Sequence, residues 1–339
     1  KRLDLDGNFE FNTARLINHS CNPNCEVFGT GLKIWVYAMK NIKKGDELSY
    51  DYGFSYDEDY KAYPCKCGAK NCVGYIVRQG SRWRIKKKKK VTVDIILPNF
   101  NSSDYIKQTI KSIINQTFKN WKLIIVDDCS NKKTKMILKK FSKNKKIKIF
   151  WLKKNNGAGY CRNYALKKTK SPYLAFIDSD DTWEKDKLKK QLNFMKKNNF
   201  SFSFTDYKTF GEKKRNINNP PKLNYLDFLR NTSIATSTMM VKRNIIGNIK
   251  FTNTKICEDF FFKCKLLKKV GYAFCLSQYL TSYRIRKNSL QSSNLKNFYW
   301  IWKINKKYNK FSFFRNIISL INISFNSLKK YGGKNLFKF

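Results

Sequence analysis

Short apolar runs alternate with an amphipathic stretch in the middle of the chain. Residues 91–97 and 121–126 consist mainly of Val, Ile and Leu, and the segment between them repeats isoleucine at helical spacing, at Ile106, Ile110, Ile113 and Ile114. Strand, helix and strand within about 35 residues are typical of a βαβ unit with parallel strands. The pattern therefore predicts an α/β domain that begins near residue 91.

The residues before this domain have a different pattern. Short strand-like runs in GLKIWVYAMKNIKKGDELSYDYGF are broken by Gly and Asp. A run of five lysines follows, and such a run is usually a solvated linker. We expect a small, mostly β domain, a basic linker, an α/β domain and a basic helical tail, over residues 1–80, 81–90, 91–290 and 291–339.

The chain is strongly basic, with 70 Lys and Arg against 24 Asp and Glu in 339 residues and a formal net charge of +46. A hydrophobic fraction of 42% still supplies a core, so the composition predicts a folded protein. The sequence contains no nucleic-acid-binding motif, and we expect no specific nucleic-acid partner. Attraction to nucleotide phosphates or anionic lipid headgroups follows from the charge.

The expected compartment is the cytoplasm. No stretch is typical of a signal peptide, and none has about 18 successive apolar residues. The crowded cysteines near the start favour metal ligation in a reducing environment over a disulfide framework. Because the chain begins at Lys1 and not at Met, we expect a missing upstream segment.

Three thiols in CKCGAKNC, those of Cys65, Cys67 and Cys72, have the spacing C-x-C-x4-C. Zinc needs four tetrahedral ligands, so a fourth must come from elsewhere. Cys21 is the first candidate and Cys25 the second. Either would tie this segment to ARLINHSCNPNCE, which contains the only histidine of the chain, His19.

The segments ARLINHSCNPNCE, GDELSYDYGF and CKCGAKNCVGYI resemble, in this order, the C-terminal half of a SET domain and its post-SET zinc module, over roughly residues 1–80. SET domains are protein-lysine methyltransferases that use S-adenosylmethionine. The resemblance implies that Asn18 and His19 contact the cofactor, that Tyr52 is catalytic and that Tyr50 limits the number of methyl groups.

The glycine-containing N-terminal half of the SET family has no counterpart in this chain. We therefore expect S-adenosylmethionine and a protein-lysine substrate only if that half is supplied upstream. Otherwise His19 and the tyrosines only pack and form hydrogen bonds, while the zinc site remains.

The segments VTVDIILPNF, LIIVDDCS, NNGAGYCRNYAL and YLAFIDSDDTW resemble, in this order, the family 2 glycosyltransferases of GT-A fold, over roughly residues 91–285. The GT-A fold is Rossmann-like. The resemblance implies an inverting enzyme that uses a nucleotide-diphosphate sugar and a divalent metal, Mg²⁺ or Mn²⁺. The resemblance implies Asp128 at the nucleobase, Asp180 at the ribose with Asp178 assisting, Asp181 at the metal and Asp259 as catalytic base.

The residue chemistry agrees with these roles. Asp127 and Asp128 follow an apolar run, at the carboxyl end of a strand, where α/β sheets open a ligand crevice. The alternative is that both aspartates cap the next helix. Asp178, Asp180 and Asp181 crowd three carboxylates into four residues, and these repel one another unless a cation compensates.

Other charged groups have two interpretations each. Arg162 follows a Gly-rich turn at Gly157 and Gly159 and suits either a phosphate or an aspartate partner. The pair Glu258 and Asp259 would supply the base that takes the acceptor's proton, or else is an exposed acidic pair. Either arginine of YRIRKNSL, Arg284 or Arg286, suits the diphosphate.

The tail places apolar residues on one helical face with basic residues nearby. The apolar set is Phe314, Ile317, Ile318, Ile321 and Phe325, and the basic set is Lys306, Lys307, Lys310 and Arg315. One interpretation is a core helix of the catalytic domain. The other is peripheral attachment to the inner face of the membrane.

The leading hypothesis is an inverting glycosyltransferase that modifies a cell-envelope polysaccharide or a lipid-linked glycan and carries a zinc-bound remnant of a SET domain. The first alternative is a protein-lysine methyltransferase. The second is a basic zinc module that docks an inactive transferase-like domain onto an anionic surface.

Overall fold

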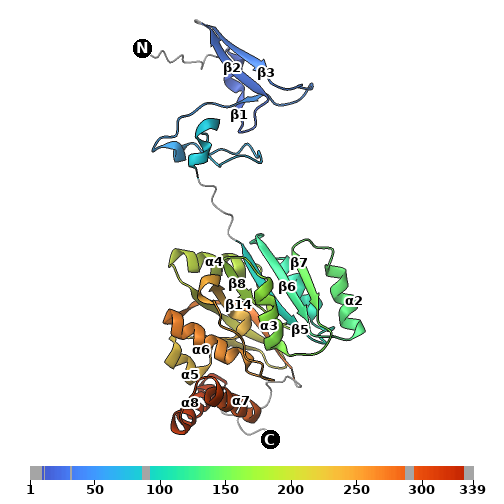
Figure 1. Ribbon diagram of the computed structural model, residues 1–339, viewed down its shortest axis with the longest axis vertical. Coiled ribbons are helices and arrows are strands. Elements are labelled where there is room, and N and C mark those ends of the chain that lie inside the picture. Colours follow the sequence, from blue (N-terminus) through green and yellow to red (C-terminus); the bar gives the residue numbers. More distant parts are fainter. Residues whose placement is uncertain (1–9, 11, 31–32, 86–91, 287–293, 332–339) are drawn as a thin grey trace. The chain divides into compact units, whose positions relative to one another are not determined.

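The structure is a computed structural model that describes residues 10, 12–30, 33–85, 92–286 and 294–331 (Figure 1). The chain divides into two compact units, Lys1–Lys89 and Lys90–Phe339, which we call the N-terminal and the C-terminal unit. The expected lysine linker lies largely outside the described residues, at 86–90.

A mixed sheet of ten strands forms the centre of the C-terminal unit. Its parallel part has the order β8-β5-β6-β7, made of Tyr173–Phe176, Val93–Asn99, Trp121–Asp127 and Ile147–Trp151. The helix between β5 and β6 is α1 (Ile106–Ile114), so the expected βαβ unit is confirmed. All four carboxyl ends of these strands therefore lie at one edge of the sheet.

The sheet continues past β8 with the order β13, β10, β14 and β12, which are Met240–Lys242, Phe202–Gly211, Tyr272–Ile285 and Lys222–Asn224. Two short strands, β9 (Thr182–Trp183) and β11 (Arg215–Ile217), pair with β14 and β10. The β14 strand is long enough to carry its last residues, which include Arg284, back to the edge where the parallel strands end.

Helices cover both faces of the sheet (Figure 1). They are α2 (Lys132–Phe141), α3 (Ala158–Lys168), α4 (Lys187–Lys197), α5 (Tyr225–Asn231) and α6 (Glu258–Val270), besides α1. Successive residues of a strand point to opposite faces, so Ile95 and Ile96 of β5 enter two different cores. The α/β fold expected from the sequence is confirmed.

Two further helices, α7 (Asn294–Lys307) and α8 (Phe313–Tyr331), lie side by side next to α5 (Figure 1). The face of α8 expected to be apolar is largely turned outward, since four of its five residues are exposed and Ile317 is half-buried. The interpretation of this face as part of the core is wrong, because the inward face carries Asn316, Ser319 and Ile323 instead. Within the described residues, no helix combines the length and apolar character needed to cross a membrane.

The N-terminal unit is small and rich in short strands. Strand β1 (Asn18–His19) pairs in parallel with β4 (Ser49–Tyr50), and β2 (Cys25–Thr30) forms an antiparallel hairpin with β3 (Lys33–Ala38). Three 3₁₀ helices complete the described part, at Thr13–Leu16, Tyr60–Ala62 and Gln79–Arg84. Its buried apolar residues are few, namely Cys21, Cys25, Val77 and Ile85.

Candidate functional site

Asp127, the last residue of β6, forms a hydrogen bond that joins the ends of β5 and β6. The carboxylate is fully buried and accepts a 2.7 Å hydrogen bond from the side-chain amide of Asn99, at the end of β5. It also accepts from the backbone N–H of Ser130, at 3.1 Å. The interpretation that the Asp127–Asp128 pair caps the next helix is wrong, because Asn131 is the N-cap of α2.

Asp128 holds the turn that starts α3. Its two oxygens accept hydrogen bonds from the backbone N–H groups of Asn156 and Gly157, at 2.8 and 2.7 Å. Gly157 has φ of 89°, a left-handed conformation that suits glycine. A carboxylate has about four acceptor positions, so Asp128 keeps capacity for a donor group of a ligand.

The three aspartates after β8 are held by groups from distant parts of the chain. Asp181 is buried, and its oxygens accept from the hydroxyl of Ser237 at 2.6 Å and from the backbone N–H of Arg284 at 2.8 Å. Asp180 pairs with Arg286, whose guanidinium nitrogen lies 2.8 Å from Oδ2. Burial and the charges of the neighbouring carboxylates raise the pKa of both Asp180 and Asp181.

These carboxylates fit a divalent cation that is shared with a ligand. Within the described residues, the carboxylate oxygens do not converge into a group of three or more ligands. Protein Mg²⁺ sites usually use one or two carboxylates together with substrate phosphates, so Asp181 and a diphosphate would complete such a set. Burial is the main cause of the raised pKa of Asp181, and the charges of Asp180 and Asp178 add to it, so a bound cation would favour the ionised carboxylate.

Arg162, on α3, is enclosed by carboxylates. One guanidinium nitrogen lies 2.6 Å from Asp178, and the other donates to Glu258 at the start of α6. Its side chain is only 4% exposed. Of the two roles expected for Arg162, the structure shows the pairing with an aspartate.

Asp259, the second residue of α6, forms a partly buried ion pair, and its side chain is 18% exposed. Its Oδ2 accepts from the ammonium of Lys263 at 2.5 Å and from the hydroxyl of Thr236. Although burial opposes ionisation, the Lys263 ammonium lowers the pKa of Asp259 to about 2. The interpretation of Glu258 and Asp259 as an exposed acidic pair is therefore wrong.

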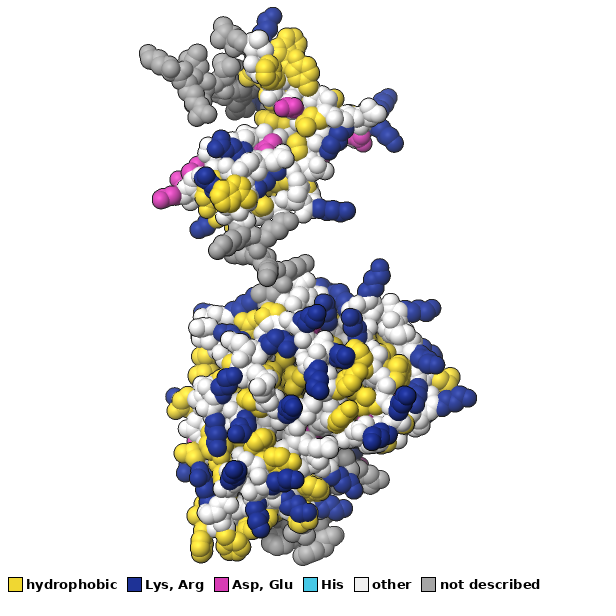
Figure 2. Space-filling view, viewed as in Figure 1, with side chains coloured by type: hydrophobic (Ala, Val, Ile, Leu, Met, Phe, Trp, Pro, Cys, Tyr) yellow, Lys and Arg dark blue, Asp and Glu magenta, His cyan; other side chains and the backbone are white. Residues whose placement is uncertain are grey.

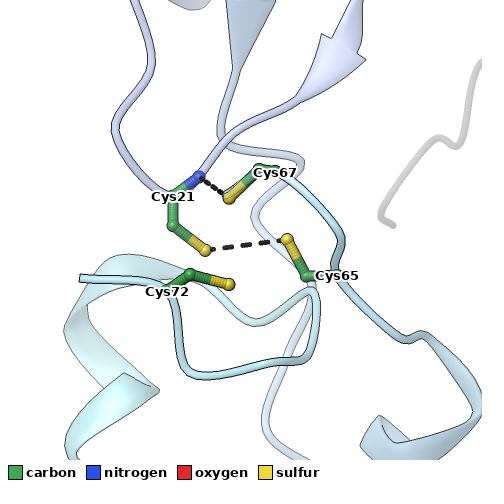
Figure 3. A group of neighbouring side chains, drawn as sticks. All are labelled: Cys21, Cys65, Cys67 and Cys72. Carbon is green, nitrogen blue, oxygen red and sulfur yellow. Dashed lines mark hydrogen bonds between the residues drawn. The ribbon is translucent and has the colours of Figure 1, made fainter. Parts of the chain in front are cut away.

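Four cysteines of the N-terminal unit form a compact group, and Figure 3 shows their side chains converging. The sulfur atoms of Cys21, Cys65, Cys67 and Cys72 lie within 4.8 Å of one another. Four thiolates at the usual Zn–S distance of about 2.3 Å stand about 3.8 Å apart around a tetrahedron. The Cys21–Cys65 sulfur separation of 3.9 Å fits this geometry, and Cys25 lies outside the group.

His19 lies against this group of cysteines. Its Nδ1 accepts the backbone N–H of Tyr52 at 3.2 Å, so the proton of the neutral ring is on Nε2, 3.6 Å from the sulfur of Cys21. Burial lowers the pKa of His19, which keeps the ring neutral. The single imidazole is therefore placed to donate to a thiolate.

The pairing of β1 with β4 brings the other residues of the SET resemblance together. The rings of Tyr50 and Tyr52 are 4.9 Å apart, and the Tyr52 hydroxyl donates to the carbonyl oxygen of Ile17 at 2.9 Å. Asn18 is exposed, and its amide donates to the carboxylate of Glu47. The Tyr52 hydroxyl and the Asn18 amide thus already have partners within the unit.

Comparison with known proteins identifies both parts of the chain. Residues 94–261 match Glycosyl transferase family 2. The Bacillus subtilis protein TuaG, named for teichuronic acid biosynthesis, is 35% identical over 246 residues, which cover 71% of this chain and 98% of that protein. The chain is a family 2 glycosyltransferase. Residues 2–53 match the SET domain family, so the expected fusion is confirmed.

A second relative of this glycosyltransferase is the Escherichia coli protein WfgD, a UDP-Glc:alpha-D-GlcNAc-diphosphoundecaprenol beta-1,3-glucosyltransferase. It is 31% identical over 222 residues, which cover 62% of this chain and 84% of WfgD.

Solved structures show the same fold as the glycosyltransferase. TarS of S. aureus in complex with UDP-GlcNAc has a TM-score of 0.58 at 21% identity, over 70% of this chain and 73% of that one. A mannosyltransferase of Pyrobaculum calidifontis in complex with GDP-Man and Mn²⁺ has a TM-score of 0.54 at 13% identity, over 75% and 82%. The expected GT-A-like fold of the C-terminal unit, from here on the transferase unit, is confirmed.

Several site residues of the glycosyltransferase gave no signal in its sequence. Thr236 and Ser237 lie in a 3₁₀ turn, Thr236–Thr238, and their hydroxyls donate to Asp259 and Asp181. Lys263 is one basic residue among 70, and only its spacing of four from Asp259 on α6 pointed to a partner. Hydroxyl and ammonium groups of this kind become recognisable only when the fold is known.

Proposed function

We propose that the transferase unit moves a sugar, with inversion, from a nucleotide-diphosphate donor to a cell-envelope polysaccharide or lipid-linked acceptor. One observation carries the proposal: two consecutive residues of one turn bind Asp259, the proposed base for the acceptor, and Asp181, the proposed metal ligand on the donor side. Thr236 donates to Asp259, and Ser237 donates to Asp181. A base for the acceptor and a carboxylate for the donor's metal are thus held by the same short segment.

The donor would lie along the carboxyl edge of the sheet. In this proposal Asp128 accepts a hydrogen bond from the nucleobase and Asp180 approaches the ribose. Asp178, paired with Arg162, assists Asp180. Arg284 and Arg286, at the end of β14, face the same edge through Asp181 and Asp180 and would bind the diphosphate. The names of WfgD and of the TarS complex, with UDP-Glc and UDP-GlcNAc, favour a uridine diphosphate sugar.

The acceptor class follows from the relatives. TuaG is named for teichuronic acid, and WfgD for a diphosphoundecaprenol acceptor, so both names refer to glycans made on or for the cell envelope. We therefore propose a polysaccharide or lipid-linked glycan as acceptor for this chain as well.

The chemistry assigned to the chain's own residues is a single displacement. The acceptor hydroxyl attacks the anomeric carbon, the bond from that carbon to the diphosphate oxygen breaks, and the hydroxyl proton passes to Asp259. Oδ2 of Asp259 is held by Lys263 and Thr236, so Oδ1 would take the proton. A carboxylate whose pKa is about 2 is a weak base and does not deprotonate a free hydroxyl. The proton would therefore pass to Asp259 only as the new bond forms, because the hydroxyl becomes acidic at that stage. A cation on Asp181, Mg²⁺ or Mn²⁺, would neutralise the departing diphosphate.

Substitution of the base tests this assignment. We expect Asp259→Asn to keep the affinity for the nucleotide sugar and to lower turnover by about a hundredfold or more. Titration with UDP-, GDP- and dTDP-sugars measures the affinity and identifies the donor. The matched control is Asp104→Asn, because Asp104 is an exposed aspartate of the same unit. Normal turnover in Asp259→Asn would show that the base is another group.

Metal removal tests the donor side separately. We expect EDTA to abolish transfer, Mn²⁺ or Mg²⁺ to restore it, and Asp181→Ala to lower it by at least about a hundredfold. Full activity in chelator would contradict the role of Asp181.

For the N-terminal unit we propose a zinc-holding remnant of a SET domain. Internal hydrogen bonds occupy His19 Nδ1 and the Tyr52 hydroxyl, which supports a structural role for both. Calorimetry with S-adenosylmethionine should show no binding tighter than about millimolar. A micromolar affinity that His19→Ala weakens would instead favour the methyltransferase hypothesis.

A further inference from the structure

Helix α8 presents a continuous row of large apolar side chains to solvent. Phe314, Ile318, Ile321 and Phe325 follow one another at intervals of four, three and four residues, so they line one face of the helix. They are 58% to 76% exposed, and Phe313, the first residue of the helix, is exposed next to them. Single exposed apolar residues are ordinary, but a row of four marks an interaction surface.

The orientation of α8 is fixed by polar contacts on its opposite face. The amide of Asn316 donates to the carbonyl oxygen of Trp302 on α7, and Asn305 donates to Asn316 in turn. The hydroxyl of Ser319 donates to the carbonyl oxygen of Leu229 on α5. Asn316 and Ser319 are thus turned inward with partners, and rotation of the helix to bury its apolar row would break these bonds.

The charge around this row has one sign. No Asp or Glu follows Asp259 in the sequence. Exposed cations lie on α7, in the turn and on α8, namely Lys303, Lys306, Lys307, Lys310 and Arg315. The one acidic residue of the neighbouring α5, Asp227, accepts a hydrogen bond from the N–H of Asn224. Figure 2 shows apolar and basic side chains side by side over these helices.

We propose that α7 and α8 dock the glycosyltransferase on an anionic lipid surface, with α8 lying in the plane of the interface. An amphipathic helix in this position buries its apolar face about 5–10 Å below the headgroups, while lysines and arginines bind their phosphates. The 19 residues of α8 extend about 28 Å along the membrane. The rings of Trp302 and Phe313, which are in contact, lie at one end of the row, where aromatic groups suit the headgroup level.

Charge complementarity selects this partner over two others. A second copy of the chain would set one array of lysines against an identical array, which costs energy between like charges. A nucleic acid would satisfy the cations but offers no match for the apolar row. An anionic bilayer satisfies both features at once.

Sedimentation of the full chain with lipid vesicles tests the proposal, without any sugar nucleotide. We expect at least about tenfold stronger binding to phosphatidylcholine vesicles that contain phosphatidylglycerol than to pure phosphatidylcholine. An increase from about 0.1 M to about 0.5 M NaCl should weaken binding, because salt screens the headgroup charge.

Neutral substitutions isolate the apolar contribution. The double variant Ile318→Ser with Ile321→Ser should bind anionic vesicles at least about tenfold more weakly. The matched control is Met136→Ser, since Met136 is equally exposed but lies on α2. Both variants should keep the melting temperature and the nucleotide-sugar affinity of the wild type.

Three results would overturn the proposal. They are no sedimentation of the wild type with anionic vesicles, undiminished binding of the Ile318/Ile321 variant, and a wild-type dimer in light scattering that this variant loses. The last would make the row an interface between two copies. None of these results bears on the assignment of Asp259 and Asp181, which is measured with soluble substrates.

Discussion

Strand β5 of the transferase unit and the β2–β3 hairpin of the N-terminal unit carry similar apolar side chains in opposite surroundings. All seven residues of β5 are buried, between two strands and under helices on both faces. In the hairpin every described residue except Cys25 is exposed, including Phe28 and Trp35. Apolar alternation in a sequence therefore predicts a strand, but only the rest of the fold determines whether that strand enters a core.

The N-terminal unit has polar contacts that join distant parts of its chain. The buried guanidinium of Arg82 donates to the carbonyl oxygens of Val77 and Cys21 and pairs with Asp51. A unit with so few buried apolar groups needs a metal or a similar staple to be stable. The transferase unit, with a core on each face of its sheet, does not.

Removal of zinc should give the largest difference between the two units. We expect one zinc per chain by elemental analysis, and a strong chelator should unfold the N-terminal unit, because structural zinc contributes about 10–16 kcal/mol in small zinc-dependent folds. Limited proteolysis should then cleave residues 1–89 while the transferase unit resists. Cys67→Ser should behave like the chelated protein, and Cys25→Ser should retain the metal. Less than about half a zinc per chain would contradict the site.

Truncation of a core residue should affect only the transferase unit. Phe176 of β8 is fully buried and packs against Phe251 and Phe262. We expect Phe176→Ala to lower the free energy of unfolding of this unit by about 3–5 kcal/mol in urea titrations. Zinc retention by the N-terminal unit should not change, and a loss of zinc would show that the units are coupled.

The ion pair of Asp259 with Lys263 should stabilise the fold in a pH-dependent way. The lowered pKa of Asp259 stabilises the folded state above about pH 4 and ceases to do so as the pH falls toward 2. The shift corresponds to about 2 kcal/mol, since one pKa unit is about 1.4 kcal/mol. Lys263→Met should lose about this amount at pH 7, and its difference from the wild type should shrink below pH 4.

The control for this experiment lies on the same helix. Lys269 is exposed on α6, so Lys269→Met should differ little from the wild type at any pH. A difference between Lys263→Met and the wild type that persists unchanged below pH 3 would show that Lys263 acts by packing and not by its charge.

The smallest effect should come from the hairpin. Trp35 is half exposed on β3, and we expect Trp35→Ala to change the stability of the N-terminal unit by no more than about 0.5 kcal/mol. Chelator titrations followed by proteolysis compare the variant with the wild type. A loss as large as that of Phe176→Ala would mean that another segment covers the hairpin in solution.

The sequence predicted those features that depend on local pattern and on groups close together in the chain. The spacing of isoleucines predicted the βαβ unit. The position of aspartates directly after apolar runs predicted that they lie at the ends of β6 and β8. The cysteine spacing likewise indicated three members of one group. Each of these signals lies within a few tens of residues.

The remaining features depend on distant contacts or on the direction of a helix face. Ser237 reaches Asp181 across 56 positions, and Arg284 reaches it across 103. The periodicity of α8 showed which residues share a face but not whether that face points inward, because Asn316 and Ser319 find their partners on α7 and α5. Tertiary packing determines these distant contacts and the direction of the helix face, and the local sequence pattern does not indicate them.

Gly159 of α3 lies in close contact with the segment that leads into α6. A Cβ atom at this position would lie 2.2 Å from the carbonyl oxygen of Thr252 and 3.1 Å from Glu258. Any larger residue would therefore have to move α3 away from the backbone of Thr252 and from Glu258, the first residue of α6. The contact between α3 and the start of α6 therefore leaves no room for a side chain at position 159. We expect that substitutions which change the acceptor would lie around this contact and not at it.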